Sequence, residues 1–232
     1  MTEIKKKVLI TGANRGIGFE TAKQLRDLGC EVFLTARNED SGREAAAEIG
    51  AEFILMDVSD ENSIEAAAKT FGEHSDRLDV LINNAGIFND RDVSILEVDQ
   101  EKMFQTLLTN TWGPVLVARA FKPFLENANP GPGRIINLSS KLGQLSEMED
   151  TAPAYGLSKT ALNAVTRQLS AALKNKNIIV NSVSPGWVRT DMGGPDATSS
   201  LEEGADTVVW LAIEAPSDLT GQFLRDRELI AW

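Results

Sequence analysis

The sequence predicts an α/β fold, a single Rossmann-type, doubly wound domain in which a parallel sheet of about seven strands is flanked by helices. Two observations lead to this prediction. Short β-branched runs alternate along the chain with longer segments of helical periodicity, which is the pattern of repeated βαβ units. No internal repeat or change of composition divides the 232 residues, so we expect one domain over residues 1–232.

The expected strands are short apolar runs bounded by turn residues, and the expected helices have apolar side chains three and four positions apart. The strands lie at residues 8–10, 31–35, 52–56, 80–82, 134–138, 178–183 and 222–224. The helices lie at residues 16–28, 41–49, 61–73, 100–126, 153–174 and 201–213. A doubly wound sheet binds its ligands at the carboxyl ends of its strands. Four residues follow strands and therefore share that edge: Gly12, Asn83, Ser140 and Pro185.

Composition narrows the class of protein. The formal net charge is −11 and no stripe of Lys and Arg is present, which argues against nucleic-acid binding. Cys30 is the only cysteine and His74 the only histidine, so neither an internal disulfide nor a histidine cluster for a metal is expected. No stretch approaches the roughly 20 apolar residues of a membrane span, and the apolar run after residues 5–7 is too brief for a signal peptide. We expect a soluble, cytoplasmic protein with no membrane partner.

A glycine-rich turn follows the first strand. It reads Thr11-Gly-Ala-Asn-Arg-Gly-Ile-Gly18 and opens a predicted helix. Glycines permit positive φ and close approach to phosphate oxygens, and the N-terminus of a helix attracts anions. The turn is therefore predicted to bind the pyrophosphate of a dinucleotide, with a turn that has no ligand as the alternative. The residues expected to contact the cofactor here are Gly12, Asn14, Arg15, Gly16, Ile17 and Gly18.

Tyr155 and Lys159 lie one helical turn apart in Ala-Tyr-Gly-Leu-Ser-Lys. Reduction of a carbonyl group builds negative charge on its oxygen, which then needs a proton donor within hydrogen-bond reach. A free tyrosine has a pKa of about 10. An ammonium about 4 Å away stabilises a phenolate by about 4 kcal/mol at an effective dielectric near 20, so Lys159 is expected to lower the pKa of Tyr155 toward neutrality. A plain surface pair at helical spacing is the alternative.

The glycine turn has the spacing Gly-x-x-x-Gly-x-Gly, which is wider than the common Gly-x-Gly-x-x-Gly. With Asn83-Asn-Ala-Gly86 and the Tyr/Lys pair, it resembles the short-chain dehydrogenase/reductase family over essentially the whole chain. Val32-Phe-Leu-Thr-Ala-Arg37 and Ser184-Pro-Gly-Trp-Val-Arg-Thr-Asp-Met192 resemble the NADPH-dependent carbonyl reductases of that family. The resemblance implies a dinucleotide-binding N-terminal half and a catalytic, substrate-binding C-terminal half.

The end of the second strand indicates which dinucleotide is preferred. NAD-preferring sites usually carry an acidic residue there, about 20 residues beyond the glycine turn. This chain has Arg37 instead, and Arg15 lies within the turn, so two cations can bind a 2′-phosphate and we expect NADP(H). Two ordinary surface arginines are the alternative.

The resemblance implies further cofactor contacts. Asp57 and Val58 would meet the adenine, although an N-cap is the alternative for Asp57. The Asn83 segment would line the adenine ribose through Asn83, Ala85 and Gly86, with a plain Asn-rich turn as the alternative. The residues implied for the clamp on the nicotinamide carboxamide are Pro185, Gly186, Val188 and Thr190.

The resemblance also assigns the remaining chemistry. Ser140 would hydrogen-bond the substrate oxygen, and Ser139 is the competing candidate, but the family motif favours the second serine of the pair. Asn110 would lie at a kink in its helix and hold a water that feeds Lys159, which with Tyr155 contacts the nicotinamide ribose. The substrate pocket would be formed by Ser140, Tyr155, Trp187 and Met192, with a buried core side chain as the alternative for Trp187.

We therefore expect an NADPH-dependent oxidoreductase that reduces a ketone, aldehyde or quinone carbonyl to an alcohol, with Tyr155 as proton donor. Two alternatives stay open: a relative that acts on 3-oxoacyl, hydroxysteroid or sugar-alcohol substrates, and a non-catalytic NADP(H) sensor. Mammalian carbonyl reductases carry a long insertion between the serine and the tyrosine, whereas only residues 141–154 separate them here. That insertion accompanies a monomeric state, so both a monomer and a homo-oligomer, dimer or tetramer, are considered.

Overall fold

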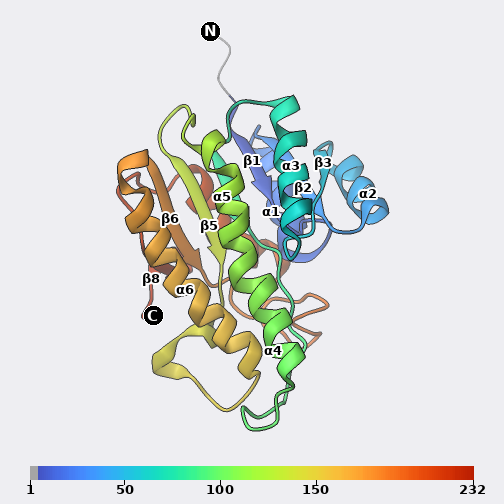
Figure 1. Ribbon diagram of the computed structural model, residues 1–232, viewed down its shortest axis with the longest axis vertical. Coiled ribbons are helices and arrows are strands. Elements are labelled where there is room, and N and C mark those ends of the chain that lie inside the picture. The colour runs from blue at the N-terminus through green and yellow to red at the C-terminus, as the bar shows by residue number, and fades with distance from the viewer. Residues whose placement is uncertain (1–4) are drawn as a thin grey trace.

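The computed structural model describes residues 5–232, and residues 1–4 of the expected domain lie outside this range. An eight-stranded sheet carries helices on both faces (Figure 1). The strands follow one another across the sheet in the order β3-β2-β1-β4-β5-β6-β7-β8, and the order reverses at β1, so the doubly wound α/β prediction is confirmed. The strands are β1 (Lys7–Ile10), β2 (Glu31–Ala36), β3 (Glu52–Leu55), β4 (Val80–Asn83), β5 (Gly133–Leu138), β6 (Ile178–Val183), β7 (Phe223–Arg225) and β8 (Glu228–Leu229).

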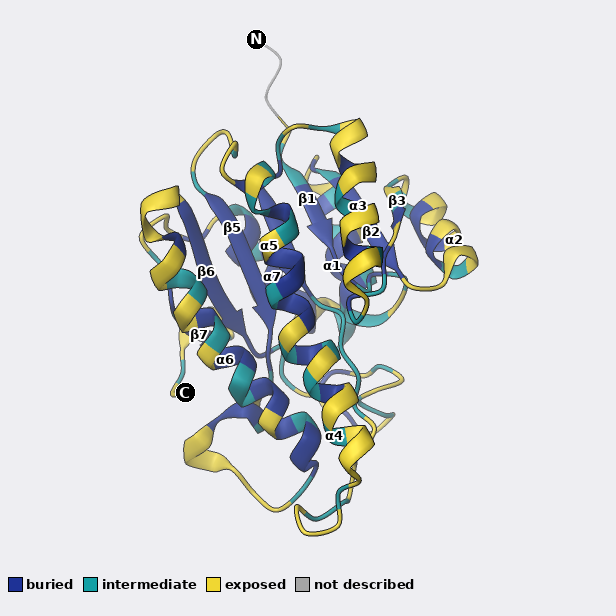
Figure 2. Ribbon diagram, viewed as in Figure 1, coloured by how far each residue is buried: buried dark blue, intermediate teal, exposed yellow. Residues whose placement is uncertain are grey.

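Helices α1, α2 and α7 cover one face of the sheet, and α3, α5 and α6 cover the other (Figures 1 and 2). The α-helices in the described range are α1 (Gly16–Asp27), α2 (Glu39–Ile49), α3 (Glu61–His74), α4 (Gln100–Leu107), α5 (Gly113–Leu125), α6 (Pro153–Leu173) and α7 (Leu201–Ile213). Single 3-10 turns lie at Lys141–Gly143, Leu145–Glu147 and Lys174–Lys176. From residue 5 onward, no helix combines the length and the apolar character that crossing a membrane requires.

The sheet has one strand more than expected because the chain turns back after β7. Asp226 and Arg227 have φ of 52° and 63°, the left-handed conformation of a two-residue hairpin turn, and β8 pairs antiparallel with β7. Glycine usually occupies the second position of such a turn. Because arginine stands there, the sequence carries no local signal for the hairpin.

The expected helix over residues 100–126 is divided into α4 and α5 by a π-helical turn at Leu108–Trp112. Pro114 has no N–H, so the carbonyl of Asn110, four positions earlier, lacks its α-helical donor. The N–H of Gly113 reaches back five positions to the carbonyl of Leu108, which is the π-helical pattern. The kink that the family resemblance implied at Asn110 is therefore present.

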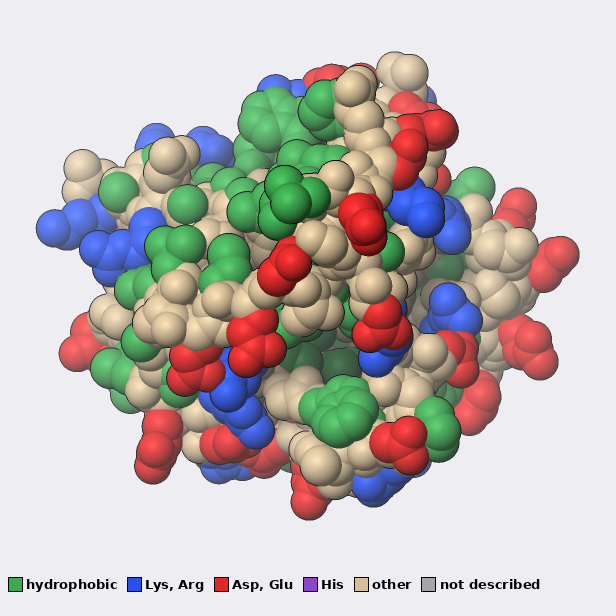
Figure 3. All heavy atoms as spheres, turned by 90° about the horizontal axis from the view of Figure 1, so that it is seen from below, with side chains coloured by type: hydrophobic (Ala, Val, Ile, Leu, Met, Phe, Trp, Pro, Cys, Tyr) green, Lys and Arg blue, Asp and Glu red, His purple; other side chains and the backbone are tan. Residues whose placement is uncertain are grey.

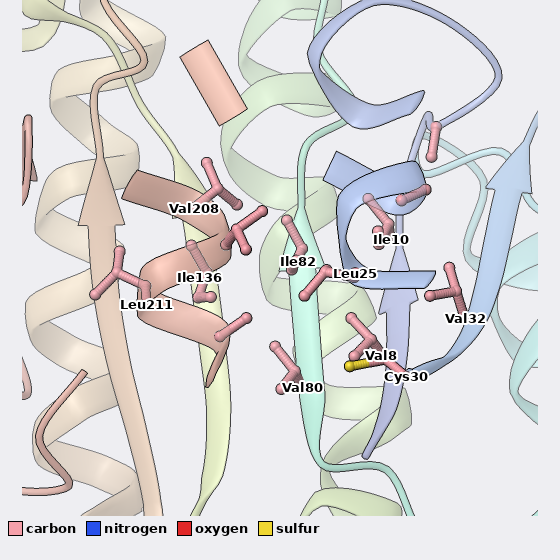
Figure 4. Close-up of a cluster of buried hydrophobic side chains, with 14 of the residues drawn as sticks. Val8, Ile10, Leu25, Cys30, Val32, Val80, Ile82, Ile136, Val208 and Leu211 are labelled. Carbon is pink, nitrogen blue, oxygen red and sulfur yellow. The ribbon is translucent and has the colours of Figure 1, made fainter. Parts of the chain in front are cut away.

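Two layers of apolar side chains, one on each face of the sheet, hold the helices in place. Val8 and Ile10 of β1 point toward Leu25 of α1, and Val208 of α7 closes the same layer (Figure 4). Residues that alternate with these along the strands point to the opposite face. There they pack around an aromatic cluster of Phe33, Phe71, Phe121 and Phe124. The central strands are thus buried between the helix layers, as Figure 2 shows, whereas β3 and β8 at the two edges of the sheet have exposed residues.

A chain of buried hydrogen bonds runs from β4 to the middle of α6. Asn83 donates to Asn137 at 2.8 Å, and Asn137 donates to Thr166 at 2.8 Å. The hydroxyl of Thr166 lies 2.7 Å from that of Ser182 on β6. All four residues are buried, so these bonds satisfy polar atoms that water does not reach. They tie the sheet to the helix whose first turn carries Tyr155.

We expect Asn137→Ala to lower the free energy of unfolding by about 2–4 kcal/mol, because it leaves the Asn83 amide without its acceptor, removes one of the hydrogen bonds of the Thr166 hydroxyl and opens a small cavity. Urea unfolding measures this change. The matched control is Asn62→Ala, because Asn62 is exposed on α3 and its side chain makes no hydrogen bond within residues 5–232; this variant should change stability by less than about 0.5 kcal/mol. Equal stabilities for the two variants would contradict the structural role of the chain.

Candidate active site

A cavity of about 810 Å³ opens at the carboxyl ends of the parallel strands. Figure 3 looks at this end of the molecule and shows a hollow with hydrophobic side chains in its depth and acidic side chains around it. The segments that follow six successive strands, β1 to β6, all contribute to its wall. Of the residues expected at the site, the cavity is lined by Gly12, Asn14, Arg15, Gly16, Ile17, Arg37, Asp57, Val58, Ala85, Gly86, Tyr155, Lys159, Pro185, Thr190 and Met192.

The glycine turn packs closely on the segment after β4. Gly12 and Gly16 both have a φ of 60°, a conformation that favours glycine. A Cβ atom on Gly12 would lie 2.9 Å from the Cα of Ala85, and one on Gly18 would lie 2.4 Å from the amide nitrogen of Asn84. Gly12 and Gly16 line the cavity. Gly18 does not line it, but its lack of a side chain lets the turn pack against Asn84.

The N-terminus of α1 faces the cavity without a cap from its own sequence. Arg15, at the N-cap position, makes no side-chain cap hydrogen bond, and the first turn carries no acidic residue. The free N–H groups and the positive end of the helix dipole are available to an anion. This arrangement, with glycines at positive φ beside it, fits a pyrophosphate group.

Asn84 lines the cavity in place of Asn83, the residue that was expected to contact the cofactor. Asn83 is the last residue of β4, and its side chain is buried against Asn137, so it does not line the cavity. Asn84 lines the cavity, and its amide donates to the carbonyls of Thr11 and Gly12 at 2.9 and 2.8 Å. The hydroxyl of Thr11 in turn accepts the N–H of Asn84. The two asparagines differ because Asn83 still belongs to β4 and reaches Asn137 on β5, whereas Asn84 is the first residue after the strand.

Arg15 and Arg37 border the end of the cavity where an adenosine is expected. Arg37 follows β2, is exposed and lines the cavity. Arg15 also lines the cavity and forms an ion pair with Asp191 at 2.7 Å, with both side chains largely in solvent. No acidic residue takes the place of Arg37 at the end of β2, so the charge at this end favours a phosphate.

Asp57 does not cap α3. That cap is Asp60, which accepts the N–H of Asn62 at 2.9 Å. The side chain of Asp57 accepts from the N–H and the hydroxyl of Ser59 at 2.9 and 2.6 Å, which fixes it at the rim of the cavity. Val58 lies beside it in the cavity wall.

Tyr155, Lys159 and Ser140 come together at the other end of the cavity. The ammonium of Lys159 lies 5.5 Å from the centre of the Tyr155 ring and donates to the carbonyl of Leu138 at 2.7 Å. The side chains of Ser140 and Tyr155 share a hydrogen bond, and Ser140 also accepts the N–H of Leu142. Ser139 lines the cavity and Ser140 does not, but the hydroxyl of Ser139 donates to the carbonyl of Lys159 at 3.4 Å and not toward Tyr155.

Burial sets the protonation of the pair. Burial raises the pKa of Tyr155 to about 12, and the hydrogen bond with Ser140 opposes this rise. Burial lowers the pKa of Lys159 to about 8. The expectation that Lys159 lowers the tyrosine pKa toward neutrality is therefore not met by the protein alone, because desolvation of the phenolate outweighs the hydrogen bond with Ser140. Both groups carry their protons at neutral pH.

Asn110 holds three segments together. Its side-chain oxygen accepts the N–H of Ile87 at 2.8 Å, and its amide donates to the carbonyl of Ile87 at 2.9 Å and to the hydroxyl of Ser158 at 3.0 Å. Asn110 is fully buried and does not line the cavity. A Cβ atom on Gly86 would lie 3.2 Å from the Asn110 side-chain oxygen and 3.6 Å from the Lys159 ammonium, so Gly86 lets these groups approach.

The segment after β6 closes the cavity on the side of α7. Thr190 lines the cavity and accepts the N–H of Gly193 at 2.9 Å, while Val188 is buried against α7. Trp187 is not a buried core residue: it is 48% exposed and donates to the carbonyl of Gly193 at 2.9 Å. Neither Trp187 nor Gly186 lines the cavity, whereas Met192 does.

Phe88 is a site residue that sequence reasoning missed. Its ring stacks on that of Tyr155, with centroids 4.5 Å apart and an angle of 27° between the planes. Arg91 lies over the outer face of Phe88 at 4.9 Å and donates to the carbonyl of Met192 at 2.5 Å. These residues lie in an irregular segment with no periodic pattern, so only the three-dimensional contacts reveal them.

Known proteins resemble this chain over nearly its whole length. The short chain dehydrogenase family model matches residues 6–200. The short-chain dehydrogenase anuI of Penicillium roqueforti is 34% identical over 97% of this chain and 96% of its own, and carbonyl reductase (NADPH) 1 of Bos taurus is 33% identical over 97% of each chain. The NADPH-bound carbonyl reductase from chicken fatty liver has a TM-score of 0.90 at 31% identity, covering 99% of this chain and 100% of its own. The carbonyl reductase Sniffer of D. melanogaster has the same TM-score and the same coverage at 32% identity. The chain therefore belongs to the short-chain dehydrogenase/reductase family and is similar to its carbonyl reductases.

Proposed function

We propose that this protein reduces the carbonyl group of a ketone, aldehyde or quinone to an alcohol, with NADPH as hydride donor and Tyr155 as proton donor. The observation that carries the proposal is the convergence of Tyr155, Ser140 and Lys159 at one end of a cavity whose other end is a glycine turn at a helix N-terminus. The relatives named as NADPH-dependent carbonyl reductases support it.

The residues of the cavity fit NADP(H). The two glycines at positive φ and the uncapped start of α1 would receive the pyrophosphate, and Arg37 with Arg15 would bind the 2′-phosphate. A cavity of about 810 Å³ has the size of a cofactor site. Under this proposal the segments after β1 to β4 bind the dinucleotide, and those after β5 and β6, with α6, carry the chemistry.

When bound, the cofactor supplies the hydride that attacks the carbonyl carbon. The carbonyl oxygen then gains negative charge, which the hydroxyls of Ser140 and Tyr155 stabilise by hydrogen bonding. Tyr155 gives its proton to this oxygen, and a phenolate remains. The ammonium of Lys159, held by the carbonyl of Leu138, stabilises that phenolate. The positive charge of an oxidised nicotinamide ring would add to this stabilisation.

Experiments can distinguish two other functions from the proposed carbonyl reduction. A relative that acts on 3-oxoacyl, hydroxysteroid or sugar-alcohol substrates would share every residue above and differ only in which substrates turn over. A non-catalytic NADP(H) sensor would bind the cofactor without any need for the proton donor. The presence of Asn110, Ser140, Tyr155 and Lys159 in one assembly favours an enzyme.

Tyr155→Phe is expected to lower kcat by about 10²–10⁴-fold because the carbonyl oxygen loses its proton donor. Loss of NADPH absorbance with a panel of ketones, aldehydes and quinones measures the rate, and NADPH fluorescence shows whether the cofactor still binds. Binding should persist. A variant that turns over as fast as the wild type would remove Tyr155 from the mechanism, and a wild type that binds NADPH but reduces nothing would favour the sensor.

Arg37→Ala is expected to raise KM for NADPH by about 10–100-fold and to leave KM for NADH unchanged, because a charge-assisted bond to the 2′-phosphate contributes about 1.5–3 kcal/mol. Arg43→Ala is the matched control, since Arg43 pairs with Glu39 on the exposed face of α2. Steady-state kinetics with each cofactor give the comparison. Parallel changes in both KM values would show that Arg37 does not select the phosphate.

The rate of reduction is expected to fall as the pH rises through about 8. Burial lowers the pKa of Lys159 to about 8 and raises the pKa of Tyr155 to about 12, so Lys159 loses its proton first while Tyr155 still holds its own. The phenolate then forms without a neighbouring ammonium. The pH profile of kcat with saturating NADPH measures this, and a flat profile from about pH 7 to about pH 10 would contradict it.

A further inference from the structure

The catalytic helix α6 starts without a cap of its own. Ala152, at the N-cap position, has a φ of 49° and makes no side-chain hydrogen bond to the helix. Pro153, the first helical residue, has no N–H. The first backbone donors of α6 therefore belong to Ala154 and to Tyr155 itself, and they need an acceptor from elsewhere in the chain.

Asp90 provides that acceptor from the segment after β4. Its Oδ2 atom accepts the N–H of Ala154 at 2.5 Å and lies 3.4 Å from the N–H of Tyr155. Asp90 is only 1% exposed, and its Oδ1 atom has no hydrogen-bond partner within residues 5–232. Burying a carboxylate with one oxygen unpaired costs stability. The positive end of the α6 dipole offsets part of this cost.

The same segment also fixes the ring of Tyr155. Phe88, two positions before Asp90, stacks on it with centroids 4.5 Å apart. Arg91, the residue after Asp90, covers the outer face of Phe88 at 4.9 Å. Residues 88–91 thus contact Tyr155 at two points, its backbone N–H and its aromatic ring, and this segment directly follows the cavity wall at Gly86 and Ile87.

We propose that Asp90 is a positioning residue for Tyr155: by capping α6 from the segment after β4, it places the Tyr155 hydroxyl beside Ser140, and Phe88 fixes the plane of the ring. This inference rests on the proposed function, because the position of the hydroxyl affects the rate only if Tyr155 gives a proton to the substrate. Asp90 touches none of the reacting atoms. Its effect on the reaction passes through the backbone of α6.

The kinetic test compares Asp90→Ala, which removes the acceptor, with Asp90→Asn, whose amide oxygen keeps it. We expect Asp90→Ala to lower kcat by about 10–100-fold with KM for NADPH within about twofold, because a small displacement of a proton donor has an effect of this size. Asp90→Asn should recover most of the wild-type kcat. The matched control is Asp99→Ala, since Asp99 caps α4 by accepting the N–H of Lys102 at 3.1 Å. The control should keep the wild-type kcat.

A spectroscopic readout separates positioning from general loss of structure. Tyr155 is the only tyrosine in the chain, so protein labelled with 13C at the tyrosine Cζ gives one NMR signal that reports this residue alone. We expect Asp90→Ala and Phe88→Ala to shift or broaden the signal. Asp90→Asn and Asp99→Ala should leave it in place. If Asp90→Ala does not fold, Phe88→Ala, which leaves the cap intact, still tests whether this segment positions the ring.

An unmoved signal and an unchanged kcat in Asp90→Ala would overturn the inference. A folded Asp90→Asn that is as slow as Asp90→Ala would overturn it too, because the charge and not the capping bond would then matter. If the wild type reduces no carbonyl, the proposed function fails, but the NMR comparison still decides whether Asp90 and Phe88 position Tyr155. The two failures are therefore distinguishable.

Discussion

The side-chain amide of Asn110 is the interaction on which the rest of the site depends. It joins the π-helical turn to the segment after β4 through Ile87 and to α6 through Ser158. These three segments have no regular hydrogen bonds to one another, so a side chain must supply them. The π-turn brings Asn110 inward because Pro114 interrupts the α-helical pattern at that point. Pro114 thus helps to place Asn110 where it contacts both α6 and the segment after β4.

The segment after β4 connects the two halves of the site. At its start, Asn84 and Ala85 pack under the glycine turn through the hydroxyl and carbonyl of Thr11. At the other end of this segment, Asp90 accepts the N–H of Ala154 in the first turn of α6. The buried chain from Asn83 through Asn137 to Thr166 makes a second connection between the same strand and the same helix, deeper in the fold. The segments beside the glycine turn and helix α6 are thus connected twice, once within the sheet and once at its edge.

The parts of the site that lie in one local stretch were the parts that the sequence could predict. The glycine turn is read from spacing, because a strand, three glycines and a helix follow one another directly. The Tyr155/Lys159 pair is read from helical periodicity. The seven parallel strands could be predicted because short apolar runs alternate along the chain with segments of helical periodicity.

The remaining features depend on contacts that no local pattern contains. Whether Asn83 or Asn84 faces the cavity depends on where β4 ends, and strand ends are the least certain part of a prediction. The β8 hairpin uses Arg227 in a left-handed conformation that favours glycine. The direction of the Tyr155 pKa shift depends on how deeply the ring is buried, which is a property of packing and not of sequence spacing.

The distribution of charge has a consequence for how fast an anionic cofactor reaches the cavity. The chain carries a formal net charge of −11, yet Arg15, Arg37 and Lys159 line the cavity wall. At long range the field of the whole molecule repels a dinucleotide phosphate, and only within about 10 Å, the Debye length at 0.1 M salt, do the local cations attract it. Added salt screens the distant acidic surface and therefore raises the rate at which the dinucleotide reaches the cavity. The same salt weakens the contacts between the phosphate and the local cations. The encounter rate and the binding strength therefore respond to ionic strength in opposite directions.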